Sequence, residues 1–447
     1  MAIQNTLVYG TFVSCDEDNG RVDPRLHFIQ NKGATIQHIL SWGLGVESTA
    51  ILVRWLLEPS TRPCPLEDLI VLTSMTGEEY SDTGRDAEKH ILPLLRAHNV
   101  RYVQVARAGH LEADGITILD DSTQPERLFL DGDYRLSDEL ISVGSLPQYG
   151  GIHKCSLKFK AFVIESWLSA YASVPYRHAF GYNSEETSRS EKCELATARR
   201  VAFGFNADEQ VRIDRAVTYD TASRESFFPL QDWKWTRQDC VDYLASVFGM
   251  TWGRSCCVFC PFTKRDAEAV QRHREHPEQV ADAMILEHMS LSLNHRGQLY
   301  AKESLIQITL ASGDQRAEAA YNAKLADVEW AVYRVRRIYQ AGKRDGVVDY
   351  TKKGIASRAV ENLQIFATRE EAEQGLDMLA ARQQAEIEVI RNIRYAYITR
   401  RGLQYPAREE FFTVAPNYVA TKARYGILYF DDQWDAAQLR LFDACAA

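Results

Sequence analysis

The most informative part of the sequence for the fold is "HILSWGLGVESTAILVRWL", residues 38–56. Its apolar start is typical of a buried strand, and its second half, from Glu47 onward, has apolar residues at helical spacing. Gly43 and Gly45 lie between the two halves, where a strand would turn sharply into a helix. Because glycine allows a ligand to approach the backbone and a helix N-terminus favours negative charge, this turn is suited to hold an anion. An ordinary strand-to-helix connection is the alternative.

The segments around this turn alternate between strand and helix. Apolar runs predict strands at 35–42, 68–75 and 100–107, whereas 47–58 and 84–99 have the spacing of amphipathic helices. This order of elements predicts an α/β fold, in which a parallel twisted sheet carries helices on both faces.

More elements are expected further along the same domain. The sequence predicts a helix over 158–171 and a strand over 176–183. Another helix is expected to begin after Thr236, a suitable N-cap residue, and to end at Gly249.

Three regions are predicted along the chain. Residues 1–34 show no clear periodicity and are expected to be an N-terminal extension. The α/β domain is assigned to 35–265, with a loop-rich, lid-like insertion at 107–150. Ala, Glu, Arg and Gln at helical spacing predict a mainly helical C-terminal appendage over 266–447.

The composition is typical of a globular protein. The chain has 447 residues, of which 45% are hydrophobic and 25% are charged, so it can bury a sizeable core. We expect a cytoplasmic protein without a membrane partner, because no apolar run approaches the roughly 18 residues needed to span a bilayer and no secretory signal is recognisable. A formal net charge of −9 argues against a generally polyanion-binding surface but permits a local basic groove.

Five short segments resemble, in order, the motifs of one enzyme superfamily. "GLGVESTA" is similar to the pyrophosphate-binding loop, Ser-Gly-Gly-x-Asp-Ser, of the PP-loop ATP pyrophosphatases and phosphoadenosine phosphosulfate (PAPS) reductases, although Leu44 replaces a glycine and Glu47 replaces the aspartate. The other four segments are "TSMTGEEYSDT", "LPQYGGIHKCSLKFK", "GYNSEETSR" and "FFPLQDWKWTRQDC". The resemblance covers about residues 35–265 and is strongest to the bacterial and phage PAPS reductase-like branch.

This resemblance implies an adenine nucleotide α-hydrolase-like fold and an ATP pyrophosphatase. Such an enzyme uses ATP and Mg²⁺ to adenylate a target, and it releases pyrophosphate. Related enzymes of DNA phosphorothioation and tRNA thiolation use the activation for sulfur transfer. The implied partners are a nucleotide substrate, a sulfur donor such as a cysteine desulfurase, and a DNA or RNA target. The chain could also form a homo-oligomer.

The family motifs also imply roles for individual residues. Catalytic roles fall to Glu47, Lys158 and Arg189, whose planar guanidinium suits a phosphate or sulfonate oxygen. Glu47 or Glu78 is a candidate Mg²⁺ ligand. The residues implied to contact the nucleotide are Ser41, Gly43, Leu44, Gly45, Val46, Ser48, Thr49, Thr76, Gly77, Glu78, Gly181 and Glu186.

Three cysteines are the main candidates for a metal site. Cys257 and Cys260 form a Cys-x-x-Cys pair before a proline, and Cys155 lies about a hundred residues upstream. Thiolates on a tight turn can converge on a soft metal centre. Sulfonucleotide reductases that carry a [4Fe-4S] cluster have cysteines at these three places, so the resemblance implies such a cluster.

The fourth ligand of this cluster is open. Cys240 is the first candidate, followed by Cys256 and Cys193. A structural Zn²⁺ site and free thiols are the alternatives to the cluster.

Two other functions are consistent with the sequence. A sulfonucleotide reductase would bind PAPS at the same loop, but its C-terminal Glu-Cys-Gly-Leu/Ile-His segment is missing and only Cys445 could replace its nucleophile. The other function is that of a non-catalytic nucleotide-binding or assembly subunit. The basic run "YRVRRIYQAGKRD", residues 333–345, is expected to be a solvated helix face, with contact to a nucleic-acid backbone as the alternative.

Overall fold

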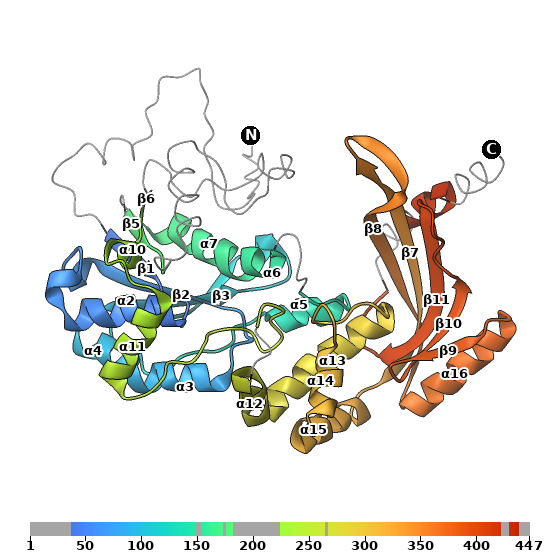
Figure 1. Ribbon diagram of the computed structural model, residues 1–447, viewed down its shortest axis with the longest axis horizontal. Helices are drawn as coiled ribbons and strands as arrows, with labels where there is room; N and C mark the ends of the chain where they lie inside the picture. The colour runs from blue at the N-terminus through green and yellow to red at the C-terminus, as the bar shows by residue number, and fades with distance from the viewer. Residues whose placement is uncertain are drawn as a thin grey trace. The chain divides into compact units, whose positions relative to one another are not determined.

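The computed structural model describes residues 37–147, 153–172, 176–181, 224–263, 267–421 and 429–437. The chain divides into two compact units (Figure 1). Unit 1 contains Met1–Leu136 and Gly150–Cys260, and unit 2 contains Ser137–Tyr149 and Pro261–Ala447. The expected N-terminal extension, residues 1–34, lies outside the described residues.

Unit 1 is built on a six-stranded sheet with the order β4-β3-β2-β1-β5-β6. Its strands are β1 (Gln37–Ser41), β2 (Leu69–Met75), β3 (Arg101–Arg107), β4 (Ile116–Ser122), β5 (Tyr176–Ala179) and β6 (Arg224–Phe227). All neighbouring strands are parallel except β4, which is antiparallel to β3. The prediction of an α/β fold with a mostly parallel sheet is therefore confirmed.

Within residues 107–147, the structure contains a strand and helical segments where the sequence suggested a loop-rich insertion. Gly115 has a φ of 72° and turns the chain back, so that β4 pairs with β3 at the edge of the sheet. Arg101 holds this pairing through two hydrogen bonds of 2.8 Å to Asp121. From Ser137 onward, helix α5 (Leu136–Ser142) belongs to unit 2.

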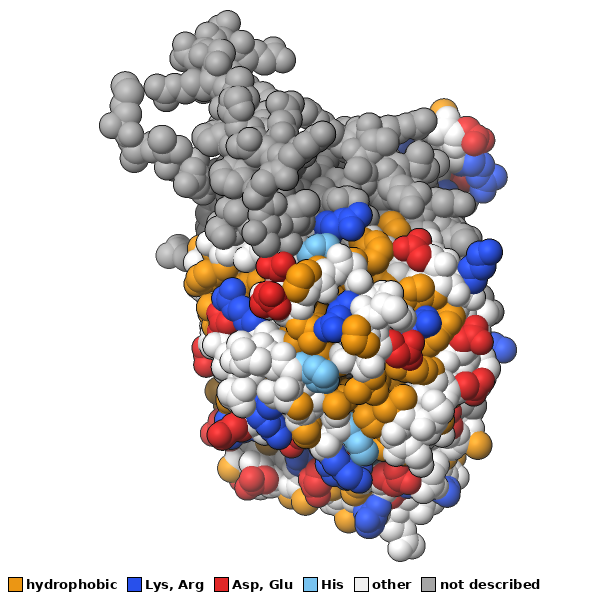
Figure 2. All heavy atoms as spheres, turned by 90° about the vertical axis from the view of Figure 1, so that its left-hand side faces the viewer, with side chains coloured by type: hydrophobic (Ala, Val, Ile, Leu, Met, Phe, Trp, Pro, Cys, Tyr) orange, Lys and Arg blue, Asp and Glu red, His pale blue; other side chains and the backbone are white. Residues whose placement is uncertain are grey.

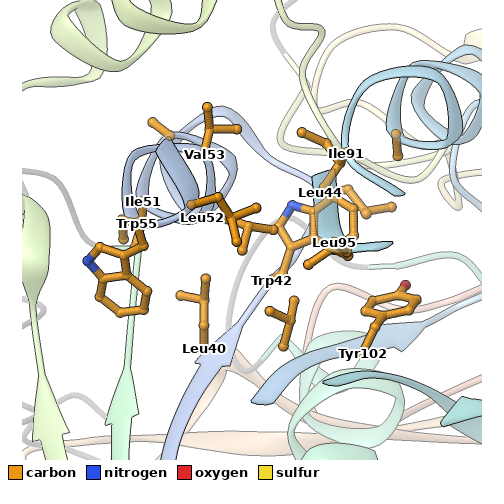
Figure 3. Close-up of a cluster of buried hydrophobic side chains, with 14 of the residues drawn as sticks. Leu40, Trp42, Leu44, Ile51, Leu52, Val53, Trp55, Ile91, Leu95 and Tyr102 are labelled. Atoms are coloured by element: carbon orange, nitrogen blue, oxygen red, sulfur yellow. The ribbon is translucent and has the colours of Figure 1, made fainter. Parts of the chain in front are cut away.

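Helices cover both faces of the sheet in unit 1. They are α2 (Val46–Leu57), α3 (Ser81–His90), α4 (Leu92–Ala97), α7 (Phe162–Tyr171), α10 (Pro229–Asp232) and α11 (Arg237–Phe248). On one face, side chains from α2, α4 and α11 pack around Leu40, Trp42 and Tyr102 of the strands and the turn (Figure 3). On the other face, α7 packs on residues of β1, β2 and β3, such as Leu72 and Val103.

Two helix predictions in unit 1 can be compared with the structure. The single helix expected over 84–99 is two helices, because Pro93 lacks an N–H and lies in the first turn of α4, after a break at Ile91. The boundaries of α11 are confirmed: the Thr236 hydroxyl accepts a hydrogen bond from the N–H of Asp239, and Gly249 ends the helix in the left-handed conformation.

Unit 2 contains an antiparallel five-stranded sheet with the order β8-β7-β11-β10-β9. Its strands are β7 (Trp330–Arg344), β8 (Val347–Phe366), β9 (Ile387–Ile390), β10 (Ile393–Thr399) and β11 (Ala407–Pro416). Its helices include α12 (Ala267–Glu275), α13 (Pro277–Leu293), α14 (Leu305–Ala311), α15 (Gln315–Ala326) and α16 (Arg369–Arg382). Helix α13 packs on Tyr333 and Val335, whereas α16 packs on Trp330 and Val332, so the two helices cover opposite faces.

The prediction of a mainly helical C-terminal region is wrong, because long strands occupy 330–366. Helix was predicted here because the arginines of β7 follow a sequence rich in Ala, Glu and Arg at helical spacing. In the sheet, Arg334 pairs with Glu410 at 2.7 Å, and Arg336 pairs with Glu361 at 2.7 Å and with Asp431 at 2.6 Å. These acidic partners are far away in the sequence, so a window of neighbouring residues could not show that the charges would be neutralised in a strand.

The helices and one face of the molecule bear on the question of membrane contact. No helix in the part of the chain that is described is long and apolar enough to cross a bilayer. The face drawn in Figure 2 mixes apolar side chains with basic and acidic ones.

Candidate functional site

The turn between β1 and α2 lies at a special point of the sheet in unit 1. Strand β1 has β2 on one side and β5 on the other, so the chain reverses the direction in which it adds strands between them. Open α/β sheets bind ligands beyond the carboxyl ends of the strands at such a reversal. The turn therefore occupies the position where a ligand site is expected.

The backbone of the turn has a glycine-like conformation at Leu44. Leu44 has a φ of 60°, in the left-handed region that glycine prefers, while its side chain is only 1% exposed and packs in the core (Figure 3). Gly45 is the N-cap of α2 and provides no side-chain cap. The N–H groups of the first turn of α2 are therefore suited to bind an anion.

Gly181 lies against the start of α2. A Cβ atom added at Gly181 would be 3.1 Å from the amide nitrogen of Ser48 and 3.3 Å from its Cα. Gly181 follows β5, so the loops on both sides of the strand reversal meet here. The structure thus brings together Gly181 and the turn, which the family motifs placed in one site.

Three other residues of the predicted nucleotide site have structural partners. The Ser41 hydroxyl lies 2.7 Å from Nε2 of His178 on β5. Thr49 is fully buried, and its hydroxyl accepts a hydrogen bond of 3.0 Å from the indole N–H of Trp42. The backbone N–H of Thr49 donates to the Gly45 carbonyl. Val46 is buried in the core. Thr49 therefore stabilises the turn with its polar groups and does not offer them to a ligand.

Glu47 forms an ion pair with Arg237 at the start of α11. The Glu47 side chain is 18% exposed, whereas that of Arg237 is 45% exposed. Glu47 therefore lies in the first turn of α2, where it could hold a cation only if Arg237 moved.

The segment after β2 lies against the Cys-x-x-Cys turn. The Thr76 hydroxyl is 3.5 Å from the Cys257 sulfur, and the N–H of Val258 donates to the Glu78 carbonyl at 3.0 Å. Glu79 and Cys257 form an isolated antiparallel bridge. Gly77 has a φ of 85° and lies under the side chain of Arg135, which leaves no room for a Cβ atom there.

Lys160 lies among acidic groups and thiols. Burial alone would lower the pKa of Lys160, but the Glu79 carboxylate and the thiols of Cys257, Cys260 and Cys155 outweigh burial and raise this pKa. These five residues are called the thiol cluster below. The three cysteines that the family motifs associated are thus neighbours in unit 1.

The thiols of this cluster are in a desolvated environment. Burial, followed by the neighbouring Glu79 carboxylate, raises the pKa of Cys257 well above its ordinary value, and burial also raises the pKa of Cys155. Without a bound metal, both groups are therefore neutral thiols at pH 7.

The described residues do not provide a complete set of ligands for an iron–sulfur cluster. Among them, no three His, Cys, Asp or Glu side chains are placed so that they could hold a metal ion. Cys240 is buried in the core of unit 1, where burial and the Glu47 carboxylate raise its pKa to about 12. Cys256 is buried, and Cys193 lies outside the described residues. No catalytic step is therefore assigned to an iron–sulfur cluster.

Ser255 connects the turn to the thiol cluster. Its hydroxyl lies 2.8 Å from the Gly43 carbonyl and 2.9 Å from the Glu79 carboxylate, two acceptors for its single proton. Three residues earlier, the indole N–H of Trp252 donates to the Leu44 carbonyl at 3.0 Å. The segment before the Cys-x-x-Cys pair therefore fixes the position of the turn.

Some site residues differ from those that sequence reasoning selected. Glu79 and Lys160 lie in the thiol cluster, whereas the motifs favoured Glu78 and Lys158. The second Glu of "TGEEY" and the second Lys of "KFK" were the available signals. The π-helical turn η4 (Leu157–Ala161) shifts the helical spacing at these lysines, which a motif cannot show. The proposed Arg189 and Glu186 lie outside the described residues.

Comparisons with models of protein families, with curated proteins and with solved structures found no match to this chain. The functional argument therefore rests on the residues, their motifs and their geometry.

Proposed function

We propose that the chain is a PP-loop ATP pyrophosphatase of the PAPS reductase-like kind. It binds ATP at the turn of residues 43–48, transfers AMP to a target and releases pyrophosphate, as the activation step of sulfur transfer to nucleic acid. The observation that carries the proposal is the close approach of Gly181 to Ser48 at the strand reversal. A side chain at position 181 would crowd the backbone at the start of α2, so glycine keeps these two segments close together.

Several features of the turn support phosphate binding. The first turn of α2 has N–H groups without a side-chain cap, and the positive end of the helix dipole lies at Gly45. A Cβ atom at Gly43 would meet nothing within 4 Å, so this part of the turn is open to a ligand. Trp252 and Ser255 hold the turn in place, which keeps the donors preorganised.

The proposed reaction is a displacement at the α-phosphate. A nucleophilic oxygen of the target attacks the α-phosphorus, and the bond to the oxygen that bridges to the β-phosphate breaks. Pyrophosphate leaves with the bonding electron pair, and the proton of the target passes to solvent. Backbone N–H groups at the start of α2 stabilise the charge that develops on the leaving pyrophosphate.

A divalent cation would assist this step. Glu47 would hold it, since a carboxylate at the phosphate-binding end of α2 is a suitable ligand for Mg²⁺. When bound, Mg²⁺ neutralises part of the charge on the pyrophosphate group. The Glu47 side chain must first leave Arg237, so cation binding and this ion pair compete.

The reaction can be tested with two nucleotides in parallel. Protein purified without oxygen is incubated with Mg²⁺ and either ATP or PAPS, and pyrophosphate, AMP and sulfite are measured. We expect pyrophosphate from ATP, and no sulfite from PAPS in the presence of thioredoxin. Sulfite release without pyrophosphate release would support a sulfonucleotide reductase instead, and consumption of neither nucleotide would support a non-catalytic subunit.

A further inference from the structure

Unit 2 contains a two-stranded arm that the proposed function does not use. Strand β7 pairs with β11 only as far as Tyr339, whereas it continues to pair with β8 up to Arg344. Residues 340–354 therefore form a two-stranded hairpin, called the ribbon arm below (the orange hairpin in Figure 1). The N–H of Tyr405 donates to the Tyr350 carbonyl of this arm at 2.8 Å.

The ribbon arm has a tight turn at its tip and a shift of register between Ala341 and Gly342. Asp345 and Gly346 have φ values of 51° and 82°, which give a two-residue hairpin turn. Gly342 and Gly354 allow the strands to approach closely, since a Cβ atom at Gly354 would be 2.6 Å from the Ala341 carbonyl. The basic residues on the arm are all exposed: Lys343, Arg344, Lys352 and Lys353.

Further basic side chains gather at the base of the arm. The Lys353 ammonium lies 5.2 Å from the centre of the Tyr339 ring, and the Arg401 guanidinium lies 5.0 Å from it. Arg400 lies 4.3 Å above the ring of Tyr397 on β10. The basic cluster is defined here as Arg296, Arg337, Lys353, Arg400 and Arg401.

The like charges of the basic cluster are close enough to oppose one another. Burial, and then the charges of Arg401, Arg337 and Arg296, lower the pKa of Lys353. Arg337 is also directly opposite Arg358 across β7 and β8, an unfavourable pairing of like charges. Such an arrangement is stabilised when an anion binds to it.

The acidic residues near the cluster are fewer than the basic ones. Glu409 accepts a hydrogen bond of 2.8 Å from Tyr339 and lies 4.0 Å from Arg337, and Glu388 bonds to Arg400 at 2.7 Å. Along the sequence, 333–358 contains eight Lys or Arg and two Asp, and 391–408 contains five Arg and no acid. Arg334, Arg336 and Arg394 pair with acids of other segments, and Arg344 lies 3.1 Å from Asp349, so the basic excess is smaller than this count. The chain as a whole has a net charge of −9.

We propose that the ribbon arm and the basic cluster bind B-form double-stranded DNA. The arm enters the major groove, and Arg296, Lys353, Arg400 and Arg401 of the basic cluster contact phosphates beside it. Arg337 is only 11% exposed and adds its charge from behind them. The major groove of B-DNA is about 12 Å wide and admits a two-stranded ribbon, whereas the deep, narrow major groove of A-form RNA does not. A cluster of basic side chains that has few carboxylate partners is stabilised when it binds the phosphates of a nucleic acid.

The inference that double-stranded DNA is the target of activation rests on the proposed function. As a binding surface, the ribbon arm and the basic cluster are independent of it, because these residues belong to unit 2 and the phosphate-binding turn belongs to unit 1. The basic run 333–345 is a strand, so the expectation of a solvated helix face is wrong.

The binding is tested with full-length protein and a labelled 30-base-pair DNA, by fluorescence anisotropy without ATP. Lys353→Gln combined with Arg401→Gln removes the two cations above Tyr339. We expect about a tenfold or larger loss of affinity, and a salt dependence of log K that is shallower by about two, one for each lost phosphate contact. Lys343→Gln combined with Arg344→Gln, two exposed positions on the arm, should have a similar effect.

The matched control is Lys302→Gln combined with Arg382→Gln, which removes the same charge from other exposed positions of unit 2. We expect this control to bind DNA as the unmodified protein does. The proposal is overturned if the arm and cluster variants bind like the control, or if no DNA binds at low salt. Equal or tighter binding of single-stranded DNA or double-stranded RNA of the same sequence would also overturn it.

Failure of this inference can be separated from failure of the proposed function. A variant of the turn, Gly45→Val combined with Ser48→Ala, should keep its affinity for DNA and lose its affinity for ATP. Pyrophosphate release by a protein that does not bind DNA would overturn only the DNA surface. DNA binding by a protein that does not consume ATP would overturn only the proposed reaction.

Discussion

Arg237 at the start of α11 forms an ion pair with Glu47 in the first turn of α2. The two residues are 190 positions apart, so the pair links the later helix to the turn between β1 and α2. In the proposed reaction, the same carboxylate holds Mg²⁺. The ion pair therefore sets how readily the cation binds.

Arg237→Gln is expected to lower the Mg²⁺ concentration that gives half-maximal pyrophosphate release, because Glu47 no longer has a competing cation. The free energy of unfolding should change by less than about 1 kcal/mol, since Arg237 is largely exposed. Glu47→Gln should raise the Mg²⁺ requirement. Glu58→Gln breaks the ion pair with Arg54 at the other end of α2 and is the control. It should leave the Mg²⁺ requirement unchanged. An unchanged Mg²⁺ requirement in both site variants would show that Glu47 is not a ligand.

Gly181→Ala is expected to weaken nucleotide binding by about tenfold or more, since the added Cβ would lie 3.1 Å from the Ser48 amide and push the first turn of α2 away from the phosphates. Binding of ATP can be measured by calorimetry, with circular dichroism to verify the fold. Gly253→Ala is the control, because a Cβ atom there meets nothing within 4 Å. Equal affinity of the two variants would place the nucleotide elsewhere.

Leu44 provides a test of backbone conformation. Leu44→Ala should destabilise unit 1 by about 3 kcal/mol, because a buried leucine is lost while the left-handed backbone is kept. Leu44→Gly should be no more destabilising, although it removes one more carbon, because glycine adopts this conformation without strain. Denaturant unfolding measures both variants, and a clearly less stable glycine variant would contradict this reading of the turn.

The iron–sulfur cluster that the family motifs imply can be tested by the colour of the protein, although no three described side chains are placed to hold a metal ion. Protein prepared without oxygen should be brown if Cys155, Cys257 and Cys260 bind an iron–sulfur cluster, and Cys257→Ser or Cys260→Ser should remove the colour. Cys64 packs against the core of unit 1 and is not one of these three thiols, so Cys64→Ser is the control and should keep the colour. Since Cys240 is buried in the core apart from these thiols, Cys240→Ala should also keep it. Colourless protein with one zinc per chain would indicate a structural site, and metal-free protein would indicate neutral thiols.

His288 in unit 2 predicts a dependence of stability on pH. Burial lowers the pKa of His288 from 6.5 to about 3, and its Nδ1 lies 2.6 Å from the Tyr321 hydroxyl. The unfolded chain binds a proton below about pH 6.5, whereas the folded chain does not until about pH 3. The free energy of unfolding should therefore fall by about 2 kcal/mol between about pH 7 and pH 5.

His288→Gln should remove this part of the pH dependence in denaturant unfolding of the full-length protein. The control is His110→Gln at an exposed position of unit 1, which should leave the dependence unchanged. An identical pH profile for the unmodified protein and the His288 variant would contradict the assignment.

The fold of unit 1 could be predicted because its signals are local. The apolar runs of β1, β2 and β3 are buried strands, and the cap at Thr236 and the stop at Gly249 are where the sequence placed them. The sheet of unit 2 could not be predicted in the same way. The charges of Arg334 and Arg336 are compensated by Glu410, Glu361 and Asp431, and such distant pairings are not visible in a window of neighbouring residues.

The candidate site could be predicted only in outline. The motifs selected Ser48 and Gly181, which lie close together, and three cysteines, which are neighbours. They did not select Lys160, because its position depends on the π-helical turn η4. They did not select Ser255, because its link between the Gly43 carbonyl and Glu79 depends on the tertiary fold.

The most direct test of the account is calorimetric titration of the full-length protein with Mg²⁺ and α,β-methylene-ATP, an analogue that cannot release pyrophosphate. We predict saturable binding to the unmodified protein. We also predict that Gly45→Val combined with Ser48→Ala abolishes this binding while circular dichroism shows an intact fold. Unchanged affinity in the folded double variant would contradict the claim that the turn between β1 and α2 holds the nucleotide phosphates.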